Sequence, residues 1–128
     1  MTDFDLPTLH VCITCLAGQP IEDPRARPGA LLFDAIGAAL AGTRTVHLHP
    51  TSCLAACERG CTAALSMPGR FSYLLGHLAP AYADDLLDYA RSYARSPTGT
   101  VMPSRRAASL KNVVLGRIPS LTNVKDTP

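Results

Sequence analysis

The stretch TSCLAACERGCTAALSMPGRFSYLLG (residues 51–76) decides the fold, because a cysteine-rich loop in it leads directly into a pair of strands. Its second half holds two strand-like apolar runs on either side of a Pro-Gly pair at 68–69. Proline followed by glycine is a strong turn signal, so we predict a β-hairpin there. Its first half places Cys53, Cys57 and Cys61 four residues apart, in a chain with only five cysteines.

Upstream of this stretch the chain has the patterns of a strand, a helix and a second strand. Leu9–Thr14 (LHVCIT) alternates apolar and polar residues, which predicts a strand that runs into Cys15. Residues 17–29 contain three prolines and two glycines and are expected to form a loop. Residues 30–42 (ALLFDAIGAALAG) have helical apolar spacing, and residues 43–50 (TRTVHLHP) predict the second strand.

Downstream of the hairpin, residues 80–96 (PAYADDLLDYARSYARS) predict an amphipathic helix with acidic residues early and arginines late, as the helix dipole favours. Residues 96–103 are expected to be a linker. Residues 104–119 (SRRAASLKNVVLGRIP) predict a short final helix or docking arm. We therefore divide the chain into a metal-binding domain at 1–95 and a basic C-terminal extension at 96–128.

The order strand, helix, strand, cysteine loop, hairpin, helix is that of a small thioredoxin-like α/β sandwich. We expect a mixed four-stranded sheet with helices packed on it, plus a C-terminal arm. A right-handed crossover makes the first two strands parallel. Both cysteine groups, Cys12 with Cys15 and the loop at 53–61, then lie beyond the ends of parallel strands, where such sheets place ligands.

The composition is that of one globular domain: 128 residues, 47% hydrophobic and 17% charged. The start, MTDFDLPTLH, lacks the basic and apolar parts of a signal peptide, and no apolar run is long enough to cross a membrane. We therefore expect a cytoplasmic protein with no membrane partner. Cytoplasmic thiols are kept reduced, which favours a metal or redox site over a disulfide framework.

Charge is distributed unevenly along the chain. Residues 1–90 carry five basic and nine acidic side chains, whereas residues 91–125 carry seven basic ones and no acid. The basic segment predicts a docking surface for an acidic partner protein, and a solvated C-terminus is the alternative. Nucleic acid is not favoured as a partner, and a homodimer stays open.

Four thiolates can complete a two-iron two-sulfur cluster, a four-iron cluster or a tetrahedral zinc site. The C-x2-C pair of Cys12 and Cys15 occurs in all three, so it does not choose among them. Thiol-disulfide chemistry of the thioredoxin type would need these two residues to open a helix, but Ala-Gly-Gln-Pro follows.

The segment CLAACERGCTAALSMPGRFSYLLGHLAPAYADDLLDY resembles the C-terminal half of thioredoxin-like two-iron ferredoxins. Their pattern has cysteines at the positions of Cys53 and Cys57, a glycine where this chain has Ala55, and a proline where it has Cys61. HVCITC resembles their first ligand strand, so Cys12 carries over. The second ligand of those ferredoxins lies farther along a longer loop than Cys15 does.

The chain from about Leu9 to Leu121 more closely resembles a bacterial family of small predicted metal-binding proteins. They are of unknown function and often lie near cobalamin-synthesis genes. This resemblance implies a metal or iron–sulfur site. With the ferredoxin resemblance we predict a 2Fe-2S cluster, and a 4Fe-4S cluster or Zn are the alternatives. Cys12, Cys53 and Cys57 have counterparts in the ferredoxins, and we predict Cys15 as the fourth ligand because its spacing from Cys12 suits binding to one iron; Cys61 is an alternative fourth ligand or a neighbour of the cluster.

Two functions follow from this resemblance. The first is a small iron–sulfur protein that transfers single electrons to or from a cytoplasmic partner enzyme, with cobalamin metabolism as one setting. The second is a zinc- or other metal-binding accessory or metallochaperone module without a redox role. We expect no enzymatic activity, since no Ser/His/Asp set or paired carboxylate is present. His47 and His49 share a strand face near Cys53; mixed Cys/His ligation stays an alternative, although half-buried strand residues are favoured.

Overall fold

The computed structural model describes residues 6–15, 22–43, 45–56, 60–102 and 106–120. In chain order, its strands and α-helices are β1 (Thr8–Cys12), α1 (Pro28–Leu40), β2 (His47–Thr51), β3 (Cys61–Ser66), β4 (Ser72–Leu78), α2 (Ala83–Arg95) and β5 (Val114–Ile118). Three short 3-10 turns, Pro24–Ala26, Pro80–Tyr82 and Ala108–Leu110, connect them. No helix of the described residues is long and apolar enough to span a membrane.

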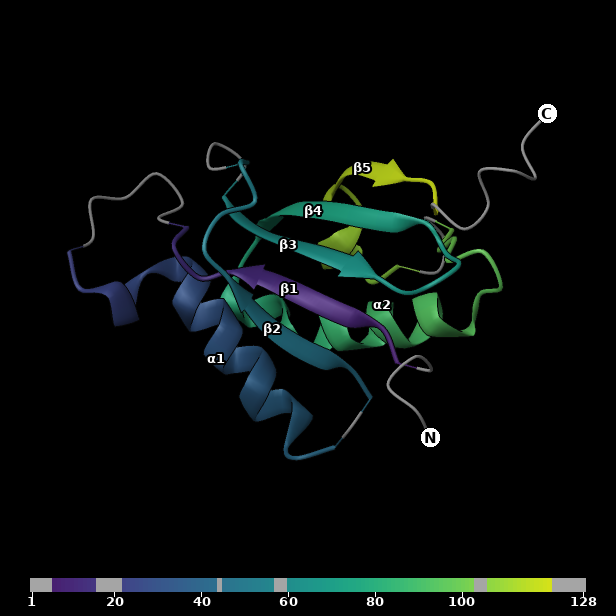
Figure 1. Ribbon diagram of the computed structural model, residues 1–128. Coiled ribbons are helices and arrows are strands. Elements are labelled where there is room, and N and C mark those ends of the chain that lie inside the picture. The colour runs from purple at the N-terminus through teal and green to yellow at the C-terminus, as the bar shows by residue number, and fades with distance from the viewer. Residues whose placement is uncertain (1–5, 16–21, 44, 57–59, 103–105, 121–128) are drawn as a thin grey trace.

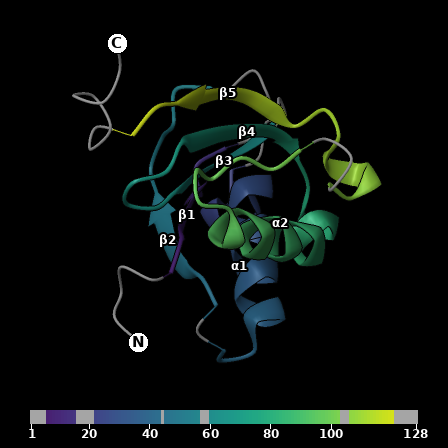
Figure 2. The same cartoon turned by 90° about the vertical axis from the view of Figure 1, so that its right-hand side faces the viewer.

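The five strands form one mixed sheet in the order β2-β1-β3-β4-β5. β1 and β2 are parallel, and the remaining neighbours are antiparallel. Figures 1 and 2 show α1 and α2 together on one face of this sheet, so in the described part of the chain no α-helix covers the opposite face. This arrangement confirms the predicted thioredoxin-like α/β sandwich, with one strand more than expected.

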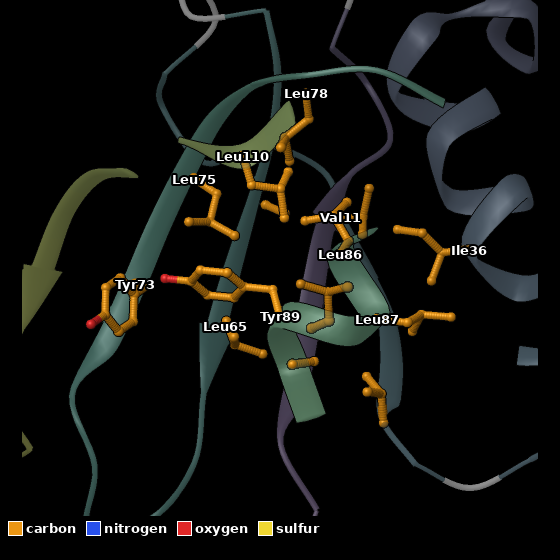
Figure 3. Close-up of a cluster of buried hydrophobic side chains, with 14 of the residues drawn as sticks. Val11, Ile36, Leu65, Tyr73, Leu75, Leu78, Leu86, Leu87, Tyr89 and Leu110 are labelled. Atoms are coloured by element: carbon orange, nitrogen blue, oxygen red, sulfur yellow. The ribbon is translucent and has the colours of Figure 1, made fainter. Parts of the chain in front are cut away.

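The core lies between the sheet and the two helices. Alternate residues of each strand face it, because side chains of a strand point to opposite faces in turn. The residues of this core that Figure 3 labels are Val11, Ile36, Leu65, Tyr73, Leu75, Leu78, Leu86, Leu87, Tyr89 and Leu110. Burial of each leucine contributes about 1.5–3 kcal/mol. The amphipathic pattern of α2 therefore anchors that helix, with its acidic residues outward.

The predicted hairpin joins β3 to β4 through Pro68 and Gly69. The amide of Arg70 donates to the carbonyl oxygen of Met67 at 3.2 Å, which closes the turn. Gly69 has φ +78°, a conformation that costs glycine little and other residues more. Proline followed by a glycine with positive φ is the signature of a type II turn, so the prediction from this dipeptide is confirmed.

The C-terminal segment differs from the expectation. The predicted helix within 104–119 is wrong: the chain forms a 3-10 turn at Ala108–Leu110 and then β5, which pairs with β4. Two valines and an isoleucine at 113–118 favour extended backbone, and the free edge of β4 supplies hydrogen-bond partners.

Part of the expected C-terminal arm belongs to the core. Val101, Leu110 and Val113 are buried with the other core residues. The described residues beyond 95 are thus packed onto the domain instead of extending from it, which corrects the expectation of an arm. The cause is long-range burial, which local helical spacing does not reveal.

Candidate metal centre

The two cysteine groups meet at one edge of the sheet. Cys12 is the last residue of β1 and is paired in register with Thr51, the last residue of the parallel strand β2. The amide of Ile13 donates to the carbonyl oxygen of Thr51 at 2.9 Å, so the chains leave both strands side by side. Because parallel strands end at the same edge, Cys12 and the loop that follows β2 are brought together.

The turn at 12–15 contacts both ends of the cysteine loop. The Cys12 thiol donates to the carbonyl oxygen of Ser52, with 3.7 Å between sulfur and oxygen. The Cys15 thiol donates to the carbonyl oxygen of Gly60, the residue before Cys61. The expected convergence of the two groups is therefore present. Cys57, which the sequence also predicts as a ligand, lies outside the described residues together with Arg59.

The four described sulfurs have different surroundings. Cys12, Cys15 and Cys61 are buried, whereas Cys53 is exposed. The backbone amide of Ala55 donates to the sulfur of Cys53 at 3.2 Å. Ala55 holds a left-handed conformation with φ +58°, which a glycine adopts without strain. The ferredoxin pattern has glycine at this place, and the turn that points the amide at the sulfur explains why.

Local contacts shift the acidities of two of these thiols in opposite directions. Burial alone would raise the pKa of Cys12. Hydrogen bonds from Thr14, from the backbone of Leu54 and from Thr62 outweigh burial and hold that pKa below its usual value. Burial, and then the neighbouring sulfurs of Cys15 and Cys12, raise the pKa of Cys61 to about 11. Cys12 therefore loses its proton more readily than Cys61, and Cys61 lies close to the sulfurs of Cys15 and Cys12.

The first turn of α1 packs directly against the Cys12–Cys15 turn. The amide of Gly29 donates to the carbonyl oxygen of Cys15 at 3.1 Å. A Cβ atom on Gly29 would meet the Cys12 carbonyl oxygen at 2.0 Å, so only glycine fits. The partial positive charge of a helix N-terminus favours anions within its first turn. The contact would therefore favour a turn whose two cysteines bind a metal as thiolates.

Sequence reasoning missed three residues of this site. The Thr14 hydroxyl donates to the Ser52 carbonyl oxygen and lies 3.5 Å from the Cys12 sulfur. Thr62 is buried beside Cys12, and its side-chain hydrogen bond to that sulfur gives the buried hydroxyl a partner. Gly29 lies in the first turn of α1, and the sequence predicts only that it stands where the loop at 17–29 meets the helix. The sequence did show that Thr14 follows the candidate ligand Cys12 by two residues, and this spacing could have indicated a hydroxyl near the sulfur.

The histidines do not join the cysteines. Among the residues that the structure describes, no three side chains of histidine, cysteine, aspartate or glutamate form a set that could hold a metal ion. Instead, His49 pairs across the sheet with His10, a residue that the sequence did not single out. Burial, followed by the charge of His49, lowers the pKa of His10 and so favours its neutral form.

The donor set fits an iron–sulfur or zinc centre in its chemistry. Thiolates are the ligands that iron–sulfur clusters and zinc prefer, and the two segments that meet at this edge carry all of the described cysteines. In the described residues these sulfurs do not yet stand as a set of three around one ion. The backbone amide that donates to Cys53 supplies the kind of hydrogen bond that such sulfurs accept, and the Thr14 hydroxyl lies next to the Cys12 sulfur. Cys12 and Cys53 belong to different segments, so the group would hold the turn and the loop together.

Comparison with solved structures defines the class of fold. The thioredoxin-like [2Fe-2S] ferredoxin from Aquifex aeolicus is similar with a TM-score of 0.55 at 18% identity, covering 88% of this chain and 92% of that one. The wild-type protein in a further crystal structure gives a TM-score of 0.53 at 17% identity, with 87% and 97% covered. A cysteine-to-serine variant gives 0.55 at 16%, with 87% and 99% covered. At these identities the likeness shows a shared fold.

Comparison with protein families places the chain more narrowly. Residues 9–120 match the family described as "Protein of unknown function (DUF1636)", and the chain belongs to that family. A comparison with curated proteins finds no match. The resemblance drawn from the sequence, to a family of unknown function and to thioredoxin-like two-iron ferredoxins, is confirmed.

Proposed function

We propose that this protein is a small ferredoxin-like carrier of single electrons that binds a 2Fe-2S cluster and has no catalytic activity of its own. One observation carries the proposal: the thiols of Cys12 and Cys15 contact the carbonyl oxygens of Ser52 and Gly60, at opposite ends of the second cysteine loop. Residues 40 and 45 positions apart are thus brought together at one thiol-rich edge, on a fold that two-iron ferredoxins share.

The proposed ligands are Cys12, Cys53, Cys57 and one of Cys15 and Cys61. A bound two-iron cluster would supply reversible one-electron transfer. The residues around the sulfurs would tune that chemistry, because hydrogen bonds to ligand sulfurs and solvent exposure set the potential of a cluster. In this chain the Ala55 amide donates to the sulfur of Cys53, and the other described cysteines are shielded from water.

A redox partner protein completes the proposal. Cys53 is the exposed cysteine of the described set, so we expect the partner to approach from the side of its loop. The basic residues of 91–125 are the expected docking charges. Two of them also serve the fold: Arg117 lies 4.1 Å over the ring of Phe71, and Arg106 donates to the carbonyl oxygen of Val101 at 3.3 Å. A setting in cobalamin metabolism stays a prediction.

The iron, sulfide and zinc content of the purified protein tests this function. Protein isolated without oxygen should be coloured and contain nearly equal iron and acid-labile sulfide. It should also accept and return one electron per cluster in a reductive titration. A colourless protein with one tightly bound zinc ion, which takes up no cluster after supply of iron and sulfide, would establish the zinc-binding accessory module instead.

A further inference from the structure

Two histidines face each other on the side of the sheet that the helices leave uncovered. His10 of β1 and His49 of β2 are register partners in the parallel pair. Their rings lie 5.4 Å apart between centroids, at an interplanar angle of 62°. His10 is half-buried and His49 is exposed, so solvent reaches the pair.

We propose that His10 and His49 together bind one borderline divalent metal ion, such as Zn²⁺, at a site distinct from the cysteine centre. The geometry fits this role. Zinc binds an imidazole nitrogen at about 2 Å with tetrahedral angles, which places two ring centroids on one ion about 5 Å apart. The observed separation of 5.4 Å is close to that distance, and the rings must turn from their edge-to-face contact so that one nitrogen of each faces the ion.

The donors select the kind of metal. Imidazole suits zinc, copper and nickel, whereas hard ions such as magnesium and calcium prefer oxygen ligands. The rings are carried by neighbouring strands, so the sheet holds their Cα atoms at a fixed spacing before any ion arrives. This preorganisation distinguishes the pair from two histidines on mobile loops.

The site is open. No third donor among the described side chains completes a set of three around the pair. A tetrahedral ion there would keep two positions for water or for an outside ligand, as accessible zinc sites do. We therefore expect binding weaker than at a closed four-ligand site and fast exchange with the solvent.

The ligand set also differs from that of the cysteine centre. Cys12 follows His10 by two residues on β1, but its sulfur is buried and bonded at the turn, next to Thr14 and Ser52. The two sites would lie at successive positions along one strand and share no ligand. Occupation of the histidine pair does not depend on whether the cysteines hold a cluster or zinc.

The test is a Zn²⁺ titration of the full-length protein, with its cysteine centre loaded, followed by calorimetry and by NMR of the histidine side-chain nitrogens. We expect one Zn²⁺ per chain in fast exchange, with nitrogen shifts confined to His10 and His49. His49→Gln, at an exposed position, and His10→Gln should each weaken binding by at least about tenfold. The double variant should lose it.

His77→Asn is the matched control. His77 is exposed and has φ +55°, a conformation that asparagine tolerates, so this variant removes an imidazole without disturbing the backbone. It should bind Zn²⁺ as the wild type does. Undiminished binding to the double variant, binding that shifts other histidines instead, or no binding to folded wild-type protein would each overturn the proposal. An unchanged visible spectrum and circular dichroism show that each variant is folded.

Discussion

Gly29 lies so close to Cys12 that no side chain fits between them. A Cβ atom on Gly29 would stand 2.0 Å from the carbonyl oxygen of Cys12 and 3.1 Å from the Cβ of Cys15. The start of α1 and the cysteine turn therefore pack as one unit, and the shape of the turn depends on a residue seventeen positions after Cys12.

Gly29→Ala should accordingly disturb both the fold and the metal centre. The added methyl group must push the turn away from α1, which we expect to cost about 1–3 kcal/mol of unfolding free energy. Gly37→Ala is the control in the same helix, because its Cβ would meet only Leu48 Cδ2 at an ordinary 3.8 Å. That change should stabilise by about 0.5–1 kcal/mol. Urea denaturation and the iron content of both variants measure these effects. Equal changes in stability and iron content in the two variants would contradict the prediction.

Serine substitution separates ligands from their neighbours. Cys12→Ser and Cys53→Ser should each abolish or badly destabilise the centre, because iron and zinc hold a hydroxyl far less well than a thiolate. Cys57→Ser should do the same. Of Cys15 and Cys61 only one should be essential, and we expect it to be Cys15, whose spacing from Cys12 suits binding to a single metal atom. Retention of the cluster in Cys15→Ser and its loss in Cys61→Ser would reverse that assignment.

Alkylation of the metal-free protein should distinguish the thiols by rate. Cys53 is exposed, whereas Cys61 is 1% exposed and its pKa is raised to about 11. At pH 8 a thiol of that pKa is a thiolate in about one molecule in a thousand. Iodoacetamide should therefore modify Cys53 well before Cys61, with mass spectrometry of peptides as the readout. The difference between the two modification rates should become smaller above pH 11. Equal rates at pH 8 in folded protein would argue against a buried Cys61.

Local sequence patterns were sufficient for most of the fold. The alternation in LHVCIT, the helical spacing after Pro28 and the Pro68-Gly69 turn each report a property of neighbouring residues, and the structure has β1, α1 and the β3–β4 hairpin there. The convergence of the cysteine groups followed from the parallel pairing of β1 and β2, which the crossover rule predicts.

What the sequence did not reveal depends on distant partners. β5 forms because the edge of β4 is free to pair with it. The local sequence pattern of residues 104–119 is compatible with a helix as well as with a strand. The tight fit of Gly29 against Cys12 and the facing of His10 and His49 depend on packing and register between separate segments. No periodicity within a single segment contains that information.

The burial of Leu110 gives a test of the corrected C-terminal segment. Leu110→Ala should cost about 2–5 kcal/mol of unfolding free energy, because the side chain is fully buried in the core. Ile118→Ala, on β5 but 63% exposed, should cost about 1 kcal/mol or less. Thermal or urea denaturation measures both. For the same reason, deletion of residues 97–128 should unfold the domain, and a truncated protein that keeps a stable metal centre would contradict the packing.

Two buried tyrosines differ in whether their hydroxyl groups have a hydrogen-bond partner, so the same substitution can be compared at both. Tyr89 and Tyr93 of α2 both pack edge-to-face on Tyr73, at 5.9 and 6.0 Å between ring centroids. The Tyr93 hydroxyl donates to the carbonyl oxygen of Phe71, whereas the Tyr89 hydroxyl is buried without a hydrogen-bond partner in the described part of the chain. A buried polar group without a partner carries an uncompensated desolvation cost.

Phenylalanine at these two positions should therefore change stability in opposite directions. Tyr89→Phe removes the unpaired hydroxyl and should raise the free energy of unfolding by about 1 kcal/mol. Tyr93→Phe leaves the carbonyl of Phe71 without its donor and should lower that free energy by about 1 kcal/mol or more. Both changes keep the aromatic ring and its contact with Tyr73, so the packing is matched. Urea denaturation of the two variants measures the difference, and a loss of equal size in both would show that the Tyr89 hydroxyl has a partner after all.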